Sequence, residues 1–303
     1  MIKRTICIEN ACFLKFANQQ MIVSFSHIKG MEDKPDKSVP IEDLGMLVLE
    51  HQQISLTHYL LEKLVAANVA VVTCNDTHHP TGLLLPLESN TLQSERFRWQ
   101  IEATEPLKKQ LWQQTVKAKI SNQAAILKKW EGKFIFLQNL AAGVKSGDAD
   151  NSEAIAAAHY WQNLFPPAWN FYRKRGGVPP NNLLNYGYAI VRAGMARALV
   201  GAGLLPTLGI FHRNRYNAYC LADDMMEPYR PYVDMVVRAM IDKTSAVENL
   251  TPELKVELLK IPALDVLLDK DKSPLMVAMQ RTAVSLARCY AGEQRKLLLP
   301  EMP

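Results

Sequence analysis

The sequence predicts an α+β protein, with a small N-terminal β-rich domain over residues 1–90 and a larger all-α domain over residues 91–303. Three observations predict this division. Short runs rich in Val, Ile, Phe and Cys alternate with turn residues before residue 90, as is typical of strands. From about residue 91 the apolar residues recur at helical spacing, with Gln, Lys and Ala between them. A chain of 303 residues is also long enough for two domains.

The first domain opens with the runs TICIEN, ACFLKF and QQMIVSF and a turn near Asn18, which predict a small antiparallel sheet. IEDLGMLVLE and NVAVVTCND predict further strands, and LTHYLLEKLVAA predicts a helix capped by Ser55 or Thr57. The neighbouring His78 and His79 would point in opposite directions in an extended chain, so we interpret them as loop residues. Nothing in residues 1–90 indicates a catalytic constellation.

The composition favours a reduced, nonmembrane protein. The cysteines are odd in number and contain no CxxC pair, which argues against a disulfide framework and against a zinc site; they are Cys7, Cys12, Cys74, Cys220 and Cys289. No run approaches the roughly 20 apolar residues of a membrane span, and the first residues lack a secretory signal. We therefore expect a cytoplasmic protein with reduced core thiols.

The positive charge is concentrated in the second domain. Residues 1–90 carry seven Lys/Arg and ten Asp/Glu, a net charge of −3. Because the net charge of the whole chain is +5, residues 91–303 carry +5 − (−3) = +8. A local basic surplus is what binding to a phosphate backbone needs, although many ordinary enzymes have one.

The second domain begins with helical periodicity interrupted at Pro106. Its residues Trp99, Trp112 and Trp130 could stack on bases, but their spacing along amphipathic helices favours the core. After the soft linker AAGVKSGDADNSE, Asn151 or Ser152 could cap a helix. That helix places Glu153 in its first turn.

Glu153 has two interpretations: an ordinary favourable interaction with the helix dipole, or part of a site. The alanines that follow it in SEAIAAAHYW allow close packing against another helix. We expect that helix to be the one bearing Asp224 and Glu227. His159 lies six residues from Glu153, roughly off its face, and is not expected to be a ligand.

A basic Gly/Pro loop then leads into a long helix. Its residues Arg173, Lys174 and Arg175 could contact phosphates or simply face water. Asn185 and Tyr186 are polar groups within the apolar helix and need hydrogen-bond partners. Tyr186 could donate to a phosphate near a metal, or bond within the core.

Residues 211–231, FHRNRYNAYCLADDMMEPYRP, gather the strongest candidates for chemistry. His212 offers an imidazole nitrogen, and Asp224 and Glu227 stand three apart on one helical face. Two such acids repel unless a cation lies between them, so a divalent metal is indicated. The alternative is an ordinary pair of solvated acids. The nearby cations suited to holding phosphates are Arg213, Arg215 and Arg230.

Three further helices are predicted by YVDMVVRAMIDK, ENLTPELKVELLK and SPLMVAMQRTAVSLARCYAGEQRK. Arg281, Arg288 and Arg295 recur every seven residues and would form one basic stripe. The stripe could lie along nucleic acid or face water.

Taken in order, Glu153 in SEAIAAAHYW, the segment PPNNLLNYGYAIVRA, His212 after GLLPTLGIFH, and ADDMMEPYRP form a combination that resembles the CRISPR-associated spacer-acquisition integrases. The length and the β-rich start look most like the compact form of single-effector, type II systems. By this resemblance Glu153, His212 and Glu227 are the metal ligands, and Asp224 is a supporting or alternative acid. Asp223 stands where the family usually has an apolar residue, which leaves open which acid faces the metal.

The resemblance also implies the activity and the partners. The helical domain would be catalytic and would use Mg²⁺ or Mn²⁺ to join the 3′-hydroxyl ends of a short protospacer duplex to the CRISPR repeat. The β-rich domain would form a homodimer, and a small ferredoxin-fold subunit would pair two dimers. The single-effector nuclease is a further expected partner, and no nucleotide cofactor is signalled. The alternatives are a hydrolytic metal nuclease acting on DNA or RNA, and a noncatalytic DNA-binding scaffold.

Overall fold

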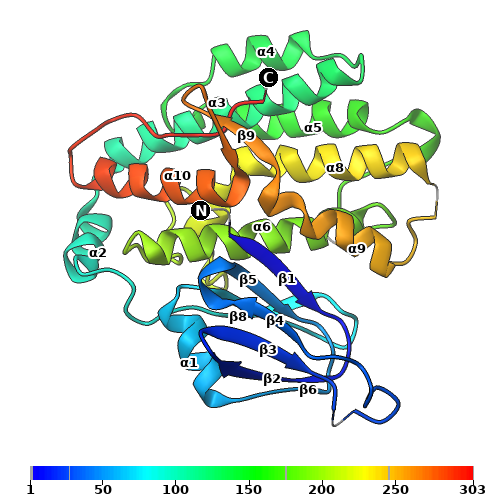
Figure 1. The fold of residues 1–303 in the computed structure, drawn as a ribbon. Coiled ribbons are helices and arrows are strands. Elements are labelled where there is room, and N and C mark those ends of the chain that lie inside the picture. The colour runs from blue at the N-terminus through cyan, green and yellow to red at the C-terminus, as the bar shows by residue number, and fades with distance from the viewer. Residues whose placement is uncertain (1–2, 27, 175, 245, 303) are drawn as a thin grey trace. The chain divides into compact units, whose positions relative to one another are not determined.

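The computed structural model describes residues 3–26, 28–174, 176–244 and 246–302. The chain divides into two compact units, Met1–Asn90 and Thr91–Pro303, of which the first is rich in strands and the second in helices (Figure 1). The expected α+β fold class is therefore confirmed. Among the described residues, no helix combines the length and apolar character needed to cross a membrane. The predicted phosphate contact Arg175 lies outside the described residues.

The first unit is built from two four-stranded sheets and one helix. One sheet has the strand order β1-β5-β7-β8 and the other β4-β3-β2-β6. The elements are β1 (Arg4–Ile8), β2 (Cys12–Ala17), β3 (Gln20–Ser24), β4 (Lys37–Pro40), β5 (Leu44–Leu49), β6 (Ile54–Leu56), α1 (His58–Ala66), β7 (Ala70–Cys74) and β8 (Pro80–Leu84). A short 3₁₀ turn, η1 (Ile41–Asp43), connects β4 to β5.

The prediction of one antiparallel sheet from the first three runs was wrong. Strands β2, β3 and β4 are antiparallel, but β1 lies in the other sheet, where it pairs in parallel with β5, and β5 pairs in parallel with β7. Local sequence shows that a run is extended but not which distant run it pairs with. The parallel order brings the carboxyl ends of β1, β5 and β7 to one edge.

The core of this unit lies between the sheets and α1. Leu14, Met21, Leu44 and Leu64 are fully buried in one apolar cluster there. Thr57, one of the two predicted caps, begins α1, since its hydroxyl accepts a hydrogen bond from the Leu60 N–H at 3.2 Å.

Two helices of the second unit, α3 and α6, make most of its contacts between helices. Its elements are α2 (Gln93–Glu102), α3 (Glu105–Lys129), α4 (Ile135–Ala142), η2 (Ser146–Asp148), α5 (Ser152–Leu164), η3 (Pro167–Trp169), α6 (Asn181–Gly201), α7 (Cys220–Met226), η4 (Glu227–Tyr229), α8 (Arg230–Lys243), α9 (Pro252–Leu259), η5 (Ile261–Ala263), β9 (Asp265–Leu268), β10 (Asp271–Pro274) and α10 (Leu275–Tyr290). Helix α6 contacts α7, α8, α9 and α10, and most of its side chains are buried (Figure 1). Such all-round burial explains its weakly amphipathic sequence.

Two details differ from the expected helical pattern. Strands β9 and β10 form an antiparallel hairpin just before α10. Helix α10 ends at Tyr290, and Gly292 takes a positive φ of 76°. Arg295 therefore lies beyond the helix, and the predicted stripe does not continue past Arg288.

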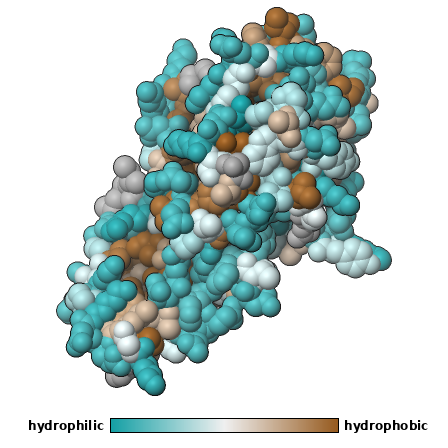
Figure 2. All heavy atoms as spheres, turned by 90° about the vertical axis from the view of Figure 1, so that its right-hand side faces the viewer, coloured by the Kyte–Doolittle hydropathy of each residue, from teal (hydrophilic) through white to brown (hydrophobic). Residues whose placement is uncertain are grey.

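The surface seen in Figure 2 is mainly hydrophilic, with hydrophobic side chains in separate patches. Exposed apolar side chains of this kind occur in both units; they include Tyr59, Leu87, Ile135, Tyr172 and Val178. Scattered single residues are normal on a folded protein.

Candidate active site

A lysine bridges two of the predicted ligands. The ammonium of Lys119, on α3, lies 2.7 Å from Glu153 Oε1 and 2.6 Å from Glu227 Oε2. Only 12% of the Lys119 side chain is exposed, so both contacts are largely shielded from water. The structure thus brings Glu153 of α5 and Glu227 of η4 together around one positive charge.

Lys119 was not predicted as a site residue from the sequence, although the helical periodicity around it indicated burial. The buried positions of α3 recur every three or four residues, at Trp112, Thr115, Val116 and Asn122, and Lys119 falls within the same stripe. A lysine at a position that helical periodicity buries needs a charged partner. Burial alone would lower the pKa of Lys119, but the charges of Glu227 and Glu153 outweigh it and raise that pKa.

Glu153 is positioned by a cap different from the one predicted. The Asp148 carboxylate accepts hydrogen bonds from the N–H groups of Ser152, at 2.8 Å, and Glu153, at 3.0 Å. Asn151 sits at the cap position in a left-handed conformation and makes no side-chain capping bond. Asp148 therefore satisfies the exposed backbone donors of α5, and Glu153 can direct its carboxylate to Lys119.

His212 is fixed by Asp224. Its Nδ1 bonds to Asp224 Oδ1, while the Phe211 N–H donates to Asp224 Oδ2 at 2.9 Å. The ring of Trp112 meets the imidazole edge-on, with centroids 5.7 Å apart. Gly209 permits the close approach of this loop, because a Cβ there would lie 2.3 Å from the His212 carbonyl oxygen. With Nδ1 engaged, Nε2 remains as the nitrogen that can ligate a metal.

The His212–Asp224 pair retains a proton. The hydrogen bond from Asp224 raises the pKa of the imidazole, against the opposing effect of burial. Burial raises the pKa of the Asp224 carboxyl, despite its bond with His212. Both shifts favour the protonated form of their group, so the pair holds its proton to higher pH than free histidine would. About 41% of the His212 side chain is exposed, which leaves the ring accessible.

The two acids predicted to share one helical face have different partners. Glu227 also contacts Arg230 Nε, at 2.8 Å. Burial would raise the pKa of Glu227, but the charges of Arg230 and Lys119 lower it overall. Asp223, the residue that left the ligand assignment open, pairs with Arg192 Nε at 2.6 Å and accepts from Asn217 at 2.7 Å.

The donor set suits a divalent cation. In the described residues, the ligand atoms of Glu153, His212 and Glu227 do not all lie within 4.8 Å of one another. The Lys119 ammonium lies between the two carboxylates and supplies there the positive charge that a divalent cation would otherwise supply. Carboxylate oxygens suit both Mg²⁺ and Mn²⁺, and Mn²⁺ accepts the one imidazole nitrogen more readily.

Beside this cluster lies a buried carboxylate between two phenols. The hydroxyls of Tyr160 and Tyr188 both donate to Asp234. The guanidinium of Arg230 lies 4.8 Å from the centre of the Tyr188 ring, and that of Arg173 lies 5.3 Å from it. Burial raises the pKa of Asp234 to about 6, despite the two tyrosine bonds. The Arg230 guanidinium thus contacts both the Tyr188 ring of this network and Glu227.

Tyr186 is fully buried in α6. A phenol in that position is not presented to solvent, so a contact with a DNA phosphate would require the packing around it to open. His159, which the sequence analysis set aside, bonds through Nε2 to the Lys133 carbonyl oxygen at 2.7 Å.

The predicted phosphate contacts differ in how available they are. Arg173 donates to Asn181 at 2.7 Å and to Asn185 at 2.8 Å. Arg213 contacts the Glu105 carboxylate at 2.7 Å. The exposed members of the set are Lys174, Arg213, Arg215 and Arg288.

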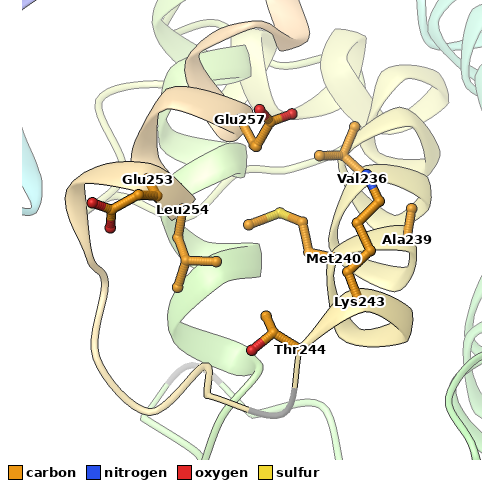
Figure 3. A pocket seen from close by; sticks show the side chains of 8 residues that line it. All are labelled: Val236, Ala239, Met240, Lys243, Thr244, Glu253, Leu254 and Glu257. Carbon is orange, nitrogen blue, oxygen red and sulfur yellow. The ribbon is translucent and has the colours of Figure 1, made fainter.

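Two hollows lie elsewhere in the second unit. One, of about 310 Å³, opens between α8 and α9, where Met240 and Leu254 face each other (Figure 3). The other, also about 310 Å³, borders α10 and is lined in part by Arg281 and Arg288. Neither contains a predicted ligand.

Helix α3 also holds the last described residues. Asn122 donates to the Pro228 carbonyl oxygen at 2.8 Å and to that of Pro300 at 3.0 Å, and it accepts from the Met302 N–H at 2.9 Å. One amide thus connects the residue that follows Glu227 with the C-terminal segment.

Comparison with known proteins identifies relatives along the whole chain. The family model described as "CRISPR associated protein Cas1" matches residues 6–255. A protein named CRISPR-associated endonuclease Cas1, from Neisseria meningitidis serogroup C, is 32% identical over 305 residues, covering 100% of this chain and 97% of its own.

Solved structures share the fold. A casposase bound to integration product superposes with a TM-score of 0.78 at 19% identity, covering 98% of this chain and 92% of its own. A chain of a Cas6-RT-Cas1–Cas2 complex does so at 0.73 and 21% identity, covering 99% of this chain and 36% of its own.

Proposed function

The chain belongs to the CRISPR-associated Cas1 family, and from that membership we propose that it is a metal-dependent DNA integrase of CRISPR adaptation. In this reaction the 3′-hydroxyl ends of a short protospacer duplex attack phosphodiesters of the CRISPR repeat. One phosphodiester replaces another, so no nucleotide cofactor is consumed. The full-length match to a Cas1 endonuclease supports the nucleic-acid chemistry.

The observation that carries the proposal is the Lys119 ammonium held between Glu153 and Glu227. It marks a place where the fold stabilises positive charge beside an accessible imidazole. We assign Glu153, His212 and Glu227 as the residues that would hold Mg²⁺ or Mn²⁺. The ion would supply a Lewis acid that neutralises charge developing on the phosphoryl oxygens.

The residues of the chain do the positioning. Asp224 holds the His212 ring through Nδ1, which sets the tautomer that leaves Nε2 available. For these carboxylates to hold a divalent ion, Lys119 would have to give up its contacts with them, and its ammonium could then pair with a DNA phosphate. Arg230, already supported by Glu227 and the Tyr188 ring, supplies a fixed positive charge beside the attacked phosphate.

The DNA path would follow the exposed cations. Lys174 and Arg215 are exposed, and Arg213 and Arg288 would exchange Glu105 and Glu293, respectively, for a phosphate. Charge-assisted bonds of this kind fix the register of a duplex without reading its sequence.

The partners follow from the family. We propose a homodimer formed through Met1–Asn90 and a small ferredoxin-fold companion subunit, acting in the cytoplasm on double-stranded DNA. The fold shared with a chain of the Cas6-RT-Cas1–Cas2 complex supports the companion subunit. The single-effector nuclease is a further partner proposed for the compact form.

A hydrolytic nuclease is the second candidate, because the Neisseria relative is named an endonuclease. The ligands would be the same, and water would replace the 3′-hydroxyl as nucleophile. The fold shared with a casposase bound to integration product favours strand transfer.

The test is joining of a labelled short duplex to a supercoiled plasmid that carries a repeat, with the companion subunit and Mg²⁺ or Mn²⁺. We expect joined product from the wild type and from His159→Ala, and none from His212→Ala or in EDTA. His159→Ala is the matched control, since in the described residues that ring bonds to the Lys133 carbonyl oxygen and contacts Phe136.

Cleavage without joining would replace the integrase proposal with the nuclease. Undiminished joining by His212→Ala would remove His212 from the ligand set. Metal-independent DNA binding without cleavage or joining would indicate a scaffold.

A further inference from the structure

A thiol and two carboxylates meet in the N-terminal unit, outside the candidate active site. The ligand atoms of Cys7, Glu9 and Glu50 all lie within 4.8 Å of one another. His78 Nδ1 adds an imidazole nitrogen 3.0 Å from Glu50 Oε1. We propose that these four residues form a second metal site, which binds a divalent transition metal of the Zn²⁺ type.

The parallel sheet creates this arrangement. Cys7 on β1 pairs with Val48 on β5, so Glu9 and Glu50, each two residues further along, continue the same face of the sheet. The Glu50 N–H donates to the Ile8 carbonyl oxygen at 3.1 Å, which extends the pairing beyond both strands. Three donors therefore project from one face at one edge.

The histidine comes from an ordered turn. After β7, the Asn75 side-chain oxygen accepts from the Thr77 N–H at 3.2 Å and from the His79 N–H at 2.8 Å. The Asn75 N–H donates to the His79 carbonyl oxygen at 3.0 Å and closes the loop. His78, at the tip, has a positive φ of 61° and is directed toward Glu50. Of the two adjacent histidines, His78 thus contributes an imidazole nitrogen to this cluster.

Burial and access are both suitable for a metal. The Glu50 side chain is 4% exposed and that of His78 is 53% exposed, so the cluster has a buried floor and an open side. Cys7 Sγ donates to Glu50 Oε2 at 3.5 Å, a long contact that a metal could replace. An ion can therefore enter from the His78 side without unfolding the sheet.

The charges of the cluster favour a cation. The carboxylates of Glu9 and Glu50 lie beside the Cys7 sulfur. A divalent cation bound there would displace the thiol proton and neutralise the carboxylates together.

The donor types select the metal. A thiolate with imidazole and carboxylate is a ligand set for Zn²⁺ and chemically similar ions, whereas Mg²⁺ takes oxygen ligands. The candidate active site has no sulfur among Glu153, His212 and Glu227. The two sites would then hold different ions, and the second would stabilise one edge of the β-rich unit.

The probe is Co²⁺, added to the metal-free full-length chain. A thiolate-to-cobalt charge-transfer band reports sulfur ligation and is silent for ligation by nitrogen and oxygen alone. We expect one equivalent to produce the band, Zn²⁺ to displace it, and Zn²⁺ to raise the midpoint of thermal unfolding. Cys7→Ser should abolish the band, and Glu50→Gln should weaken Co²⁺ affinity at least about tenfold.

Two controls separate this site from others. Cys12→Ala removes a buried thiol of the same unit outside the cluster, and His212→Ala removes a ligand of the candidate active site; both should retain the band. Absence of the band in the wild type would overturn the proposal, as would its persistence in Cys7→Ser. The wild-type result decides even if Cys7→Ser does not fold, and it leaves the integrase proposal untouched.

Discussion

Replacing Lys119 tests whether the candidate active site is a cation site. Lys119→Met removes the ammonium but keeps a long, flexible side chain. In EDTA, Glu153 and Glu227 would then face each other with the Arg230 charge left to compensate Glu227. At 2.7 and 2.6 Å, each contact has a Coulomb energy of about 6 kcal/mol at an effective dielectric constant of about 20, and desolvation offsets much of it. Removing one partner of such a buried pair typically costs about 3–5 kcal/mol.

The assay is urea unfolding followed by circular dichroism, in EDTA and in saturating Mn²⁺. We expect the free energy of unfolding of Lys119→Met to fall by about 3–5 kcal/mol in EDTA. With Mn²⁺ the difference from wild type should shrink, because the ion replaces the missing charge. Lys117→Met is the matched control: it lies on the same helix, is exposed, and should change stability by less than about 0.5 kcal/mol.

Two results would refute this reasoning. An equal loss in EDTA and in Mn²⁺ would mean that no ion takes the place of the ammonium. No loss in EDTA would mean that the carboxylates do not need the charge that the structure places between them.

Three other predictions follow. The folded pKa of Asp234 is about 6, above the usual 3.8, so ionisation of this carboxyl is penalised in the folded state. As the pH rises from 4 to 7, the free energy of unfolding of the wild type should therefore fall by up to about 3 kcal/mol relative to that of Asp234→Asn. Urea unfolding at each pH measures this difference. Parallel pH profiles would contradict that. Gly187→Ala places a Cβ 2.4 Å from Val233 Cγ1 and should destabilise by about 1–3 kcal/mol, with an unchanged thermal midpoint as the contrary result. Glu105→Gln should leave the urea midpoint unchanged but tighten DNA binding at low salt, because Arg213 is released; weaker binding would argue against a phosphate contact.

The sequence predicted the fold class because strand and helix periodicities are local properties. Thr57 as the cap of α1 is local in the same sense. The pairing of β1 with β5 was missed because it joins residues about 40 apart, through contacts that no nearby residue specifies. The cap from Asp148 was missed because it acts from four residues before Ser152.

The candidate site was predicted only in part, for a related reason. The ordered motif containing Glu153, His212 and Glu227 indicated chemistry, and the assignment of these residues as ligands remains a prediction. Lys119 carries no motif, and its importance depends on three helices meeting. Cys7 and Glu50 likewise lie 43 residues apart, so the absence of a CxxC pair could not exclude the cluster that the sheet assembles.

The bonds made by Asn122 have a consequence for the order of events during synthesis. Asn122 and Pro300 are separated by 178 positions, which at about 5–20 residues per second takes the ribosome roughly 9–36 s to translate. Throughout that interval the α3 amide that also holds the Pro228 carbonyl lacks its C-terminal partners. A nascent chain would therefore reach its fully bonded candidate site only after Pro300 and Met302 have been made, which delays the moment at which it could first act on DNA.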